Sequence, residues 1–549
     1  MNSEHDQIKF NGDPDVVDKE EDKMSSEKDH KKFNDDPYVV GKWEMIETEF
    51  MGAATHTALL PGNKVFAYGG SSLDRRAFKH PPPAEILDLD TMQTRRISMQ
   101  GVEGDLWCGG HTLLEDGKLM FVGGTYEYPP SGEGAYKGLD HAYTFDPFTE
   151  QWVQLDNMLE GRWYPTVIRL ADNTVLSIAG LPKGEEGKNL GLKDIIQKNQ
   201  EIYRPGQGWV LMDEKRMFPL YPRLHLLSNG DVFYSGVFNT HFFLPGLFPS
   251  MRWKSGKGWR KVGGHHKDKS REEGVSLLLA LRPEDNYAER IMVAGGGNAA
   301  LFRGLTAVLQ RLGKSSWIEK LRSNKALNSV DLIDLSEDNP RWQQKASMHK
   351  RRIHGVGVLL PDGAVLVVGG MTRHGHVEGT QIEKFAVRSP EMYDPVDDVW
   401  HLLPPQQKNR VYHSTALLLP DGRVISMGSN PHPGHIEKSI EIYSPPYLFW
   451  GDRPVILEYP EKITYDQTFN LKVDNTRHIS QVVLRRLDVL THVTNTDQRL
   501  LELTCKVLSD EKLEVDGPLK REHMPQGYCL LFVISKDGVP SEGKFVLVQ

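Results

Sequence analysis

A two-segment apolar pattern occurs seven times along the chain and limits the folds that are open to it. Each copy has an apolar segment of strand length, a turn with Gly, Asn or Asp, and a second apolar segment that usually ends in glycine. The copies are THTALLPGNKVFAYGG, HTLLEDGKLMFVGG, TVIRLADNTVLSIAG, RLHLLSNGDVFYSG, the weaker VSLLLALRPEDNYAERIMVAGGG, GVLLPDGAVLVVGG and TALLLPDGRVISMG. The pattern predicts seven β-hairpins in an all-β chain.

Short segments that follow the hairpins extend each repeat to four strands. Examples are WVQLD at 152–156, WVLMD at 209–213 and WHLLP at 400–404. Most successive copies lie roughly 50 to 70 residues apart, the period of a kelch-type β-propeller blade. The seventh repeat lacks such a segment, whereas WEMIE at 43–47 precedes the first repeat. The N-terminal strand should therefore complete the last blade and close the ring.

After the last repeat the pattern changes to shorter alternating segments. FNLKV, QVVLRRL and CLLFVIS lack the glycine pairs and are typical of a β-sandwich. The sequence thus predicts a disordered acidic tail over 1–42, a seven-bladed propeller over 43–452 and an immunoglobulin-like domain over 453–549. The tail holds twelve Asp and Glu against seven Lys, a composition that favours disorder.

Charge and apolar patterning argue against several classes of partner. The formal net charge is −8 and the tail supplies much of it, so the nearly neutral body is not expected to bind nucleic acid or a membrane. We read neither a secretory signal nor an Asn-x-Ser/Thr sequon, which favours a cytoplasmic protein if the signal has not been lost. Three cysteines make no disulfide framework, and Cys505 and Cys529 are expected to be free thiols. We expect a monomer.

One position recurs nine residues before the turn residue of its hairpin. It is occupied by Cys108, Tyr164, Tyr221, His354 and His413. An equal offset in a repeated blade means an equal height along the propeller axis, at the start of the innermost strand. These side chains should therefore converge on the central channel. Tyr412 lies one residue outside its strand, where the alternation of a strand need not hold, so it can face inward beside His413.

The residue types at this height point to a metal centre. Imidazole and phenolate donors suit tetragonal Cu(II). Zinc is possible, but structural zinc sites normally use closely spaced cysteine pairs, and the sequence has none. Copper is a one-electron centre here, and an oxidisable phenol nearby could hold the second redox equivalent. An ordinary copper or zinc site without further modification stays open as an alternative.

Several motifs of the chain resemble those of the copper radical oxidases, namely galactose oxidase and glyoxal oxidase. The motifs are LWCGG at 106–110, GRWYPT at 161–166, RVYHS with LLLPDGR at 410–423, THVTNTDQR at 491–499 and GVPS at 538–541. The resemblance covers nearly all of 43–549. It implies two-electron oxidation of a primary alcohol or aldehyde, with O2 reduced to H2O2. The sequence context around the cysteine and the GRWYPT motif are closer to glyoxal oxidases, which favours small aldehydes or simple alcohols.

The resemblance also implies a role for each ligand-type residue. Cys108 would form a thioether to Tyr164, the phenol that binds copper and holds the radical. His413 and His492 would be the imidazole ligands, and Tyr412 the axial phenolate that takes the substrate's hydroxyl proton. The implied cofactors are one copper ion and the protein-derived Cys–Tyr radical.

Other residues have two interpretations each. His354 would contact the substrate or a ligand, or would be a satisfied channel histidine. Trp163 would pack within its blade or line the substrate pocket, Tyr221 would be a packing residue, and Arg271 could reach the substrate mouth. In galactose oxidases a tryptophan that follows the cross-linked tyrosine shortly after it in sequence lies over its ring. This chain reads AGLPKGEEGK at that place in the sequence. The competing function is a propeller that only binds a protein or glycan.

Overall fold

The computed structural model describes residues 36–70, 83–128, 136–185, 188, 198–236, 249–263, 271–297, 326–373, 384–431 and 435–549. Within these residues strands dominate, and α-helix is confined to short pieces such as the four-residue α2 (Pro37–Val40). None of the helices in this part of the chain has the length and apolar character needed to cross a bilayer. The predicted all-β class is confirmed.

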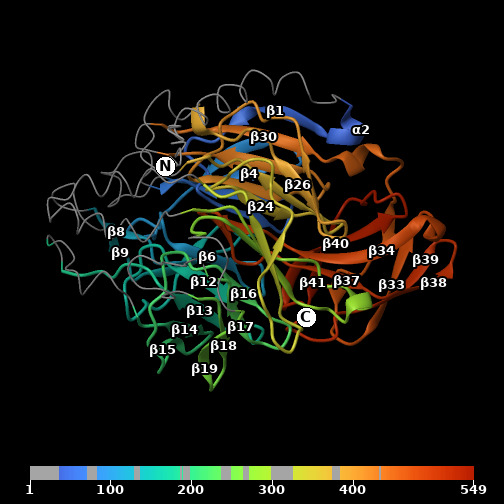
Figure 1. Ribbon diagram of the computed structural model, residues 1–549. Coiled ribbons are helices and arrows are strands. Elements are labelled where there is room, and N and C mark those ends of the chain that lie inside the picture. Colours follow the sequence, from blue (N-terminus) through green and yellow to red (C-terminus); the bar gives the residue numbers. More distant parts are fainter. Residues whose placement is uncertain are drawn as a thin grey trace, which may run out of the picture.

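Each of the seven hairpins supplies the two inner strands of a four-stranded antiparallel sheet, which we call a blade and number in hairpin order (Figure 1). Blade one contains β2 (His56–Leu60), β3 (Lys64–Tyr68), β4 (Ala84–Asp88) and β5 (Gln93–Ile97). Blade two contains β6 (Gly110–Leu113), β7 (Leu119–Val122), β10 (Ala142–Phe145) and β11 (Trp152–Gln154). Blade three contains β12 (Thr166–Arg169), β13 (Val175–Ile178), β14 (Glu201–Arg204) and β15 (Gly208–Leu211). Blade four contains β16 (Leu224–Leu226), β17 (Val232–Tyr234), β18 (Met251–Lys254) and β19 (Gly258–Lys261).

The remaining blades follow the same plan. Blade five contains β20 (Val275–Leu278), β21 (Arg290–Ala294), β22 (Val330–Asp334) and β23 (Gln343–Lys345). Blade six contains β24 (Val356–Leu359), β25 (Val365–Val368), β26 (Glu391–Asp394) and β27 (Val399–Leu402). Blade seven contains β28 (Ser414–Leu418), β29 (Val424–Gly428), β30 (Ser439–Ser444) and β1 (Lys42–Glu49). A small hairpin of β8 (Thr125–Glu127) and β9 (Lys137–Gly138) branches from blade two.

The last blade is built from both ends of the propeller segment. β1 pairs antiparallel with β30, from Lys42 opposite Ser444 to Glu49 opposite Ser439, and Figure 1 shows blue β1 beside orange β30. The preceding helix α2 is held by two aromatic donors, since Trp450 Nε1 donates to the carbonyl of Tyr38 (2.8 Å) and the Tyr443 hydroxyl donates to that of Val40 (2.7 Å). The end of the expected disordered tail therefore has defined structure, and residues 1–35 of that tail lie outside the described residues.

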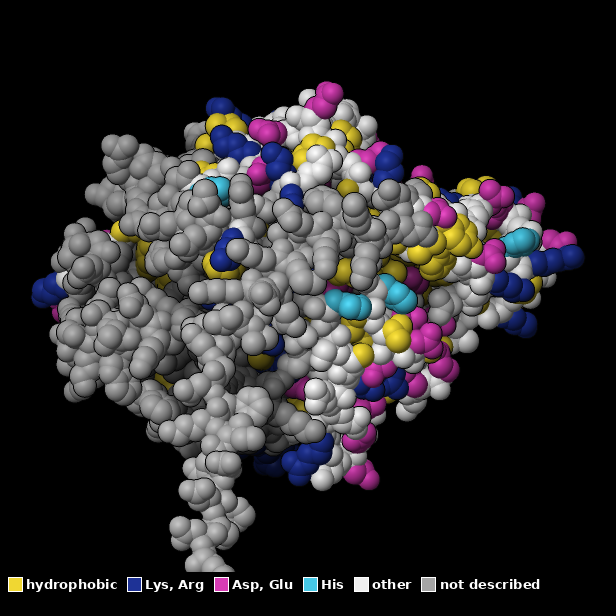
Figure 2. All heavy atoms as spheres, turned by 45° about the horizontal axis from the view of Figure 1, so that its top comes forward, with side chains coloured by type: hydrophobic (Ala, Val, Ile, Leu, Met, Phe, Trp, Pro, Cys, Tyr) yellow, Lys and Arg dark blue, Asp and Glu magenta, His cyan; other side chains and the backbone are white. Residues whose placement is uncertain are grey.

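Two sheets form the C-terminal sandwich. One contains β31 (Ile456–Glu458), β33 (Thr468–Val473), β39 (Lys512–Asp516) and β38 (Cys505–Ser509). The other contains β32 (Lys462–Ile463), β41 (Lys544–Val548), β40 (Gly527–Ser535), β34 (Ile479–Arg486) and β37 (Leu500–Leu503). Their facing sides share one apolar core, and Cys505 and Cys529 hold free thiols. Figure 2 shows acidic and basic side chains interspersed at the sandwich end. The domain boundaries at 43, 452 and 453 stay a prediction.

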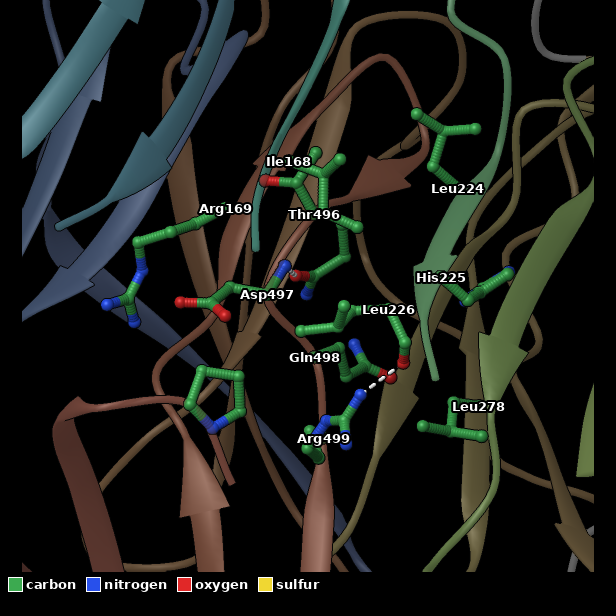
Figure 3. A pocket seen from close by; sticks show the side chains of 12 residues that line it. Ile168, Arg169, Leu224, His225, Leu226, Leu278, Thr496, Asp497, Gln498 and Arg499 are labelled. Atoms are coloured by element: carbon green, nitrogen blue, oxygen red, sulfur yellow. Dashed lines mark hydrogen bonds between the residues drawn. The ribbon is translucent and has the colours of Figure 1, made fainter. Parts of the chain in front are cut away.

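One segment leaves the sandwich and enters the propeller. β35 (Val489–Thr491) and β36 (Thr494–Asn495) extend the sheet of blade one, with Thr491 opposite His56 and Val489 opposite Ala58. The chain then passes a small cavity of about 30 Å³ between the inner strands of blades three to five, shown in Figure 3. There the Arg499 guanidinium donates to the carbonyl of Leu226 in blade four. The C-terminal domain therefore contributes directly to the lining of the propeller channel.

His225 lines this cavity and predicts a pH dependence of stability. Burial, together with the positive charge of Arg499, lowers the pKa of His225 to about 3. In the unfolded chain its pKa is about 6.5, so below that pH the unfolded chain binds a proton that the folded chain does not. We expect the free energy of unfolding to fall by about 2 kcal/mol between pH 7 and pH 5 through this residue. Chemical denaturation at both pH values should therefore show that the free energy of unfolding of His225→Gln falls less between pH 7 and pH 5 than that of the wild type. An equal fall in both proteins would contradict the assignment.

A buried ion pair recurs inside the blades. An arginine just before the innermost strand binds a carboxylate on the third strand of the same blade, at 2.8 to 3.1 Å. The pairs are Arg162–Glu201, Arg271–Asp331, Arg352–Glu391 and Arg410–Glu441. Removing one partner of a buried pair leaves an uncompensated charge, which is far more costly than the loss of an exposed pair.

We expect Asp331→Asn to destabilise the protein by about 3–5 kcal/mol, because Arg271 then stays buried without its counter-charge. The matched control is Asp510→Asn, which breaks the exposed pair with Arg477 and should cost at most about 1 kcal/mol. Equilibrium denaturation of both variants measures the difference. Equal effects would show that the buried pair does not stabilise the blade.

Candidate metal centre

The residues at the recurring position before the inner strands share an unusual backbone conformation. Their φ angles are +64° at Cys108, +67° at Tyr164, +47° at Tyr221, +63° at His354 and +67° at His413. Left-handed φ is uncommon for residues other than glycine, and such residues concentrate at functional sites. Backbone bonds join them from blade to blade: Tyr164 donates its N–H to the Cys108 carbonyl (2.9 Å), and Tyr221 donates to Tyr164 (3.1 Å). Neighbouring blades therefore hold these residues at one height.

The left-handed backbone also explains how two consecutive residues can face the channel. Neighbours in a regular strand point to opposite faces. Here the rings of Trp163 and Tyr164 stack with centroids 3.7 Å apart, and those of Tyr412 and His413 stack at 3.8 Å. The second residue of each pair has positive φ, so both pairs escape the alternation in the same way. Blades three and seven therefore share the same backbone conformation at this position.

Five residues from four separate segments meet at the centre. The ligand-type atoms of Cys108, His413 and His492 all lie within 4.8 Å of one another. The hydroxyls of Tyr164 and Tyr412 are 2.5 Å apart. The ring of His492 lies 4.7 Å from that of Tyr164 and 4.6 Å from that of His413. All of these residues are buried except Tyr412, which is partly exposed. The arrangement places two imidazoles, two phenols and a thiol around one point.

Hydrogen bonds orient both imidazoles. Nδ1 of His413 lies 2.9 Å from the carbonyl oxygen of Asn430, which can only accept, so Nδ1 carries the proton and Nε2 has a lone pair. Nδ1 of His492 contacts the hydroxyl of Thr491 at 2.7 Å, and its Nε2 lies 3.7 Å from the Cys108 sulfur. Each ring therefore anchors itself through Nδ1 and directs Nε2 toward the centre.

The phenol ring of Tyr164 is packed on its faces by aromatic neighbours. Trp163 stacks on it at an angle of 12°. The ring of Tyr221 lies 4.5 Å from it and 4.6 Å from His492, and the Tyr221 hydroxyl donates to the carbonyl of Gly109 (2.8 Å). Burial raises the pKa of Tyr221 well above its usual value, so this phenol stays protonated and packs beside the centre. The segment AGLPKGEEGK at 179–188 has no tryptophan, and the indole that stacks on Tyr164 belongs to the residue just before it.

Two residues beside the centre are not indicated by the sequence pattern. Glu273 of blade five has φ of +53° and occupies the recurring position, where its carbonyl accepts the N–H of His354 (2.9 Å). Its Oε2 lies 2.6 Å from Nδ1 of His354, whose ring is 4.8 Å from that of Tyr412. Counting nine residues onward reaches Arg282 rather than the turn, because a 3-10 turn (Pro283–Asp285) lengthens this hairpin. A count of two residues back from the strand would have found Glu273.

The second missed residue is His56 on β2. Its Nε2 accepts the N–H of Cys108 (2.9 Å) and fixes the backbone at that position. Burial, with His111 and His413 nearby, lowers the pKa of His56 well below its usual value, so the ring is neutral. His56 also lies opposite Thr491, so blade one braces Cys108 and the His492 segment together.

Arg271 lies elsewhere than at the expected substrate mouth. Its side chain is 1% exposed, and its guanidinium binds Asp331 (2.9 Å) and the carbonyl of Ser329 (2.8 Å) within blade five. The position two residues before Glu273 is the place of the recurring blade arginine, which explains the misassignment.

The comparisons with known proteins agree with this architecture. The family model described as "Glyoxal oxidase N-terminus" matches residues 83–447, and that described as "Galactose oxidase-like, Early set domain" matches 453–548. The two matches define a propeller oxidoreductase with an early-set sandwich. The chain belongs to the glyoxal oxidase family, which confirms the resemblance seen in its motifs.

Individual relatives cover most of the chain. An aldehyde oxidase GLOX of Vitis pseudoreticulata is 28% identical over 92% of this chain and 96% of its own length. A galactose oxidase of Gibberella zeae is 25% identical over 81% of this chain and 61% of its own length. A solved structure of a fungal alcohol oxidase in complex with copper matches with a TM-score of 0.73 and 20% identity, over 93% of this chain and 100% of that one. At this identity the structural likeness supports the fold alone.

Proposed function

We propose that the protein is a copper radical oxidase that oxidises a small aldehyde or primary alcohol by two electrons and reduces O2 to H2O2. The observation that carries the proposal is the convergence of Cys108, Tyr164, Tyr412, His413 and His492 on one point. The relatives named aldehyde oxidase and galactose oxidase support the same class of reaction.

The donor set fits copper. Two imidazoles with their Nε2 atoms directed inward and two phenol oxygens form a mixed N and O set that suits Cu(II). Tyr164, Tyr412, His413 and His492 would hold the ion. Bound copper would supply a site for the substrate oxygen and accept one of the two electrons.

Tyr164 and Cys108 would supply the second redox equivalent. In the proposed cross-link a C–S bond forms between the sulfur and the phenol ring while the S–H bond and one ring C–H bond break. The two electrons and two protons released reduce O2 to H2O2. The sulfur donates electron density to the ring and makes its one-electron oxidation easier. Trp163 and Tyr221 cover the ring and keep water away from the oxidised phenol.

Tyr412 would act as the general base. It is the one partly exposed member of the five, so a substrate hydroxyl can approach its oxygen. His354, fixed by Glu273, packs against its ring and limits the orientations that the phenol can take. Aldehydes would react as their hydrates, which carry the hydroxyl that Tyr412 deprotonates. We propose small aldehydes as the preferred substrates, with simple primary alcohols next.

The intact mass of the protein tests this proposal against a plain metal site. After copper loading in air the wild type should be lighter by two hydrogen atoms, and it should produce peroxide with glyoxal, methylglyoxal or a simple alcohol. Cys108→Ser keeps its mass through the same treatment because it lacks the sulfur. An unchanged wild-type mass together with no peroxide from any aldehyde or alcohol would refute the oxidase and leave an ordinary metal site or a binding propeller.

A further inference from the structure

The indole of Trp163 has an aromatic ring on each of its two faces. The Tyr164 ring lies 3.7 Å away at 12°, and the Tyr136 ring lies 4.6 Å away at 4°, measured between centroids. Both phenol rings are nearly parallel to the indole and close to its centre. They would overlap each other on a single face, so they lie on opposite faces. Trp163 is thus enclosed between Tyr164 of the metal centre and Tyr136.

The series of ring contacts continues outward. Tyr136 contacts Tyr128 with centroids 5.2 Å apart at 68°, an edge-to-face arrangement. Tyr128 follows β8 and Tyr136 precedes β9, so both rings belong to the small hairpin beside blade two. Trp163 is 3% exposed, whereas Tyr128 and Tyr136 are partly exposed. Contacting aromatic rings therefore connect the buried phenol of Tyr164 with the protein surface.

A substrate platform is the other role that an aromatic group beside an active site can have. A side chain that stacks on a substrate ring must leave one face open to it. Trp163 has no open face, because Tyr164 covers one side and Tyr136 the other. The arrangement favours a role within the protein over the binding of a planar substrate.

We propose that Trp163, Tyr136 and Tyr128 form an electron relay between Tyr164 and one-electron oxidants at the protein surface. The relay rests on the proposed function, in which the cross-linked phenol of Tyr164 must lose one electron before it can turn over substrate. Indole and phenol are the side chains that are most readily oxidised by one electron. Rings in van der Waals contact allow that electron to move without a change of bonding.

A soluble one-electron oxidant such as ferricyanide can accept the electron that Tyr164 loses. Ferricyanide takes one electron from Tyr128 and becomes ferrocyanide, and the electron is replaced in turn from Tyr136, Trp163 and Tyr164. A hydroxyl proton released from Tyr128 or Tyr136 returns when that ring is reduced again. The oxygen of Tyr164 would be bound as phenolate in the copper-loaded protein, so no proton leaves with the last electron.

The test measures, by stopped-flow absorbance, ferricyanide consumption by the full-length protein loaded with Cu(II), in which Tyr164 has not yet been oxidised. We expect Tyr136→Leu to react about tenfold or more slowly than the wild type, which should consume one equivalent. Tyr136→Phe keeps the packing but lacks the readily oxidised phenol, and it should also be slow. The matched control is Tyr126→Leu in the same hairpin, whose ring faces the Lys183 ammonium at 4.8 Å and which should react like the wild type. Copper content and thermal unfolding establish that each variant is folded and loaded.

The outcomes separate the relay from the function on which it rests. A wild type that consumes no ferricyanide overturns the radical centre and the relay with it. A wild type that consumes one equivalent, with both Tyr136 variants equally fast, overturns the relay alone. Fast oxidation of the Tyr136 variants with a raised KM for benzyl alcohol would assign the rings to substrate binding instead.

Discussion

We expect Tyr164→Phe to abolish peroxide production and the radical absorption while the protein stays folded. The substitution removes the phenol oxygen that would bind the metal and the ring that would carry the second oxidising equivalent. It keeps an aromatic ring between Trp163 and Tyr221, so the packing of the channel is retained. Peroxide-coupled kinetics, absorption spectroscopy of the oxidised protein and thermal unfolding measure the three parts of this prediction.

Tyr221→Phe is the matched control for that variant. Tyr221 is equally buried and packs against the rings of Tyr164 and His492, and its hydroxyl donates to the carbonyl of Gly109. We expect it to keep most of its activity, with a loss of stability of about 1 kcal/mol from the missing bond. An active Tyr164→Phe, or an inactive but folded Tyr221→Phe, would exchange the roles of these two phenols.

We expect Tyr412→Phe to lower kcat by about 10²- to 10⁴-fold, the usual effect of losing a general base. The ring still stacks on His413, so the imidazole keeps its orientation. Because Tyr412 takes no part in the proposed cross-link, the intact mass should still fall by two hydrogen atoms after copper loading. This combination distinguishes the proton acceptor from the radical phenol.

Two results would contradict that assignment. If Tyr412→Phe kept its kcat and changed only KM, the phenol would bind substrate without accepting its proton. If the variant failed to lose two hydrogens while binding copper normally, Tyr412 would be needed for the cross-link itself. Copper content, measured on the same samples, separates both cases from simple loss of the metal.

Periodicity alone located much of the candidate centre. An equal count from the turns brought Cys108, Tyr164 and His413 to one height because each repeat folds as the same blade. His492 has no such register, since it reaches the channel through the pairing of β35 with β2, a contact between distant parts of the chain. Only the resemblance of the surrounding motif indicated it. Glu273 was missed because a longer turn in its hairpin breaks the count.

Trp163 shows a different limit of sequence reasoning. Alternation along a strand predicts that it points away from Tyr164, yet the two rings stack because Tyr164 has left-handed φ. Backbone dihedrals of this kind leave no signal in hydrophobic periodicity. For Tyr412 and His413 the sequence predicted that both side chains can face inward, but only because Tyr412 lies beyond the end of the predicted strand.

The entry of the His492 segment into blade one has a consequence for biosynthesis. Tyr164, Tyr412 and His413 are all made before the ribosome reaches the sandwich, but the fourth proposed ligand, His492, is added only within the last sixty residues of the chain. A nascent or truncated polypeptide can thus fold its blades without acquiring a complete cupric pocket. Under the proposed function, a product that ends before His492 would therefore lack one of its four copper ligands.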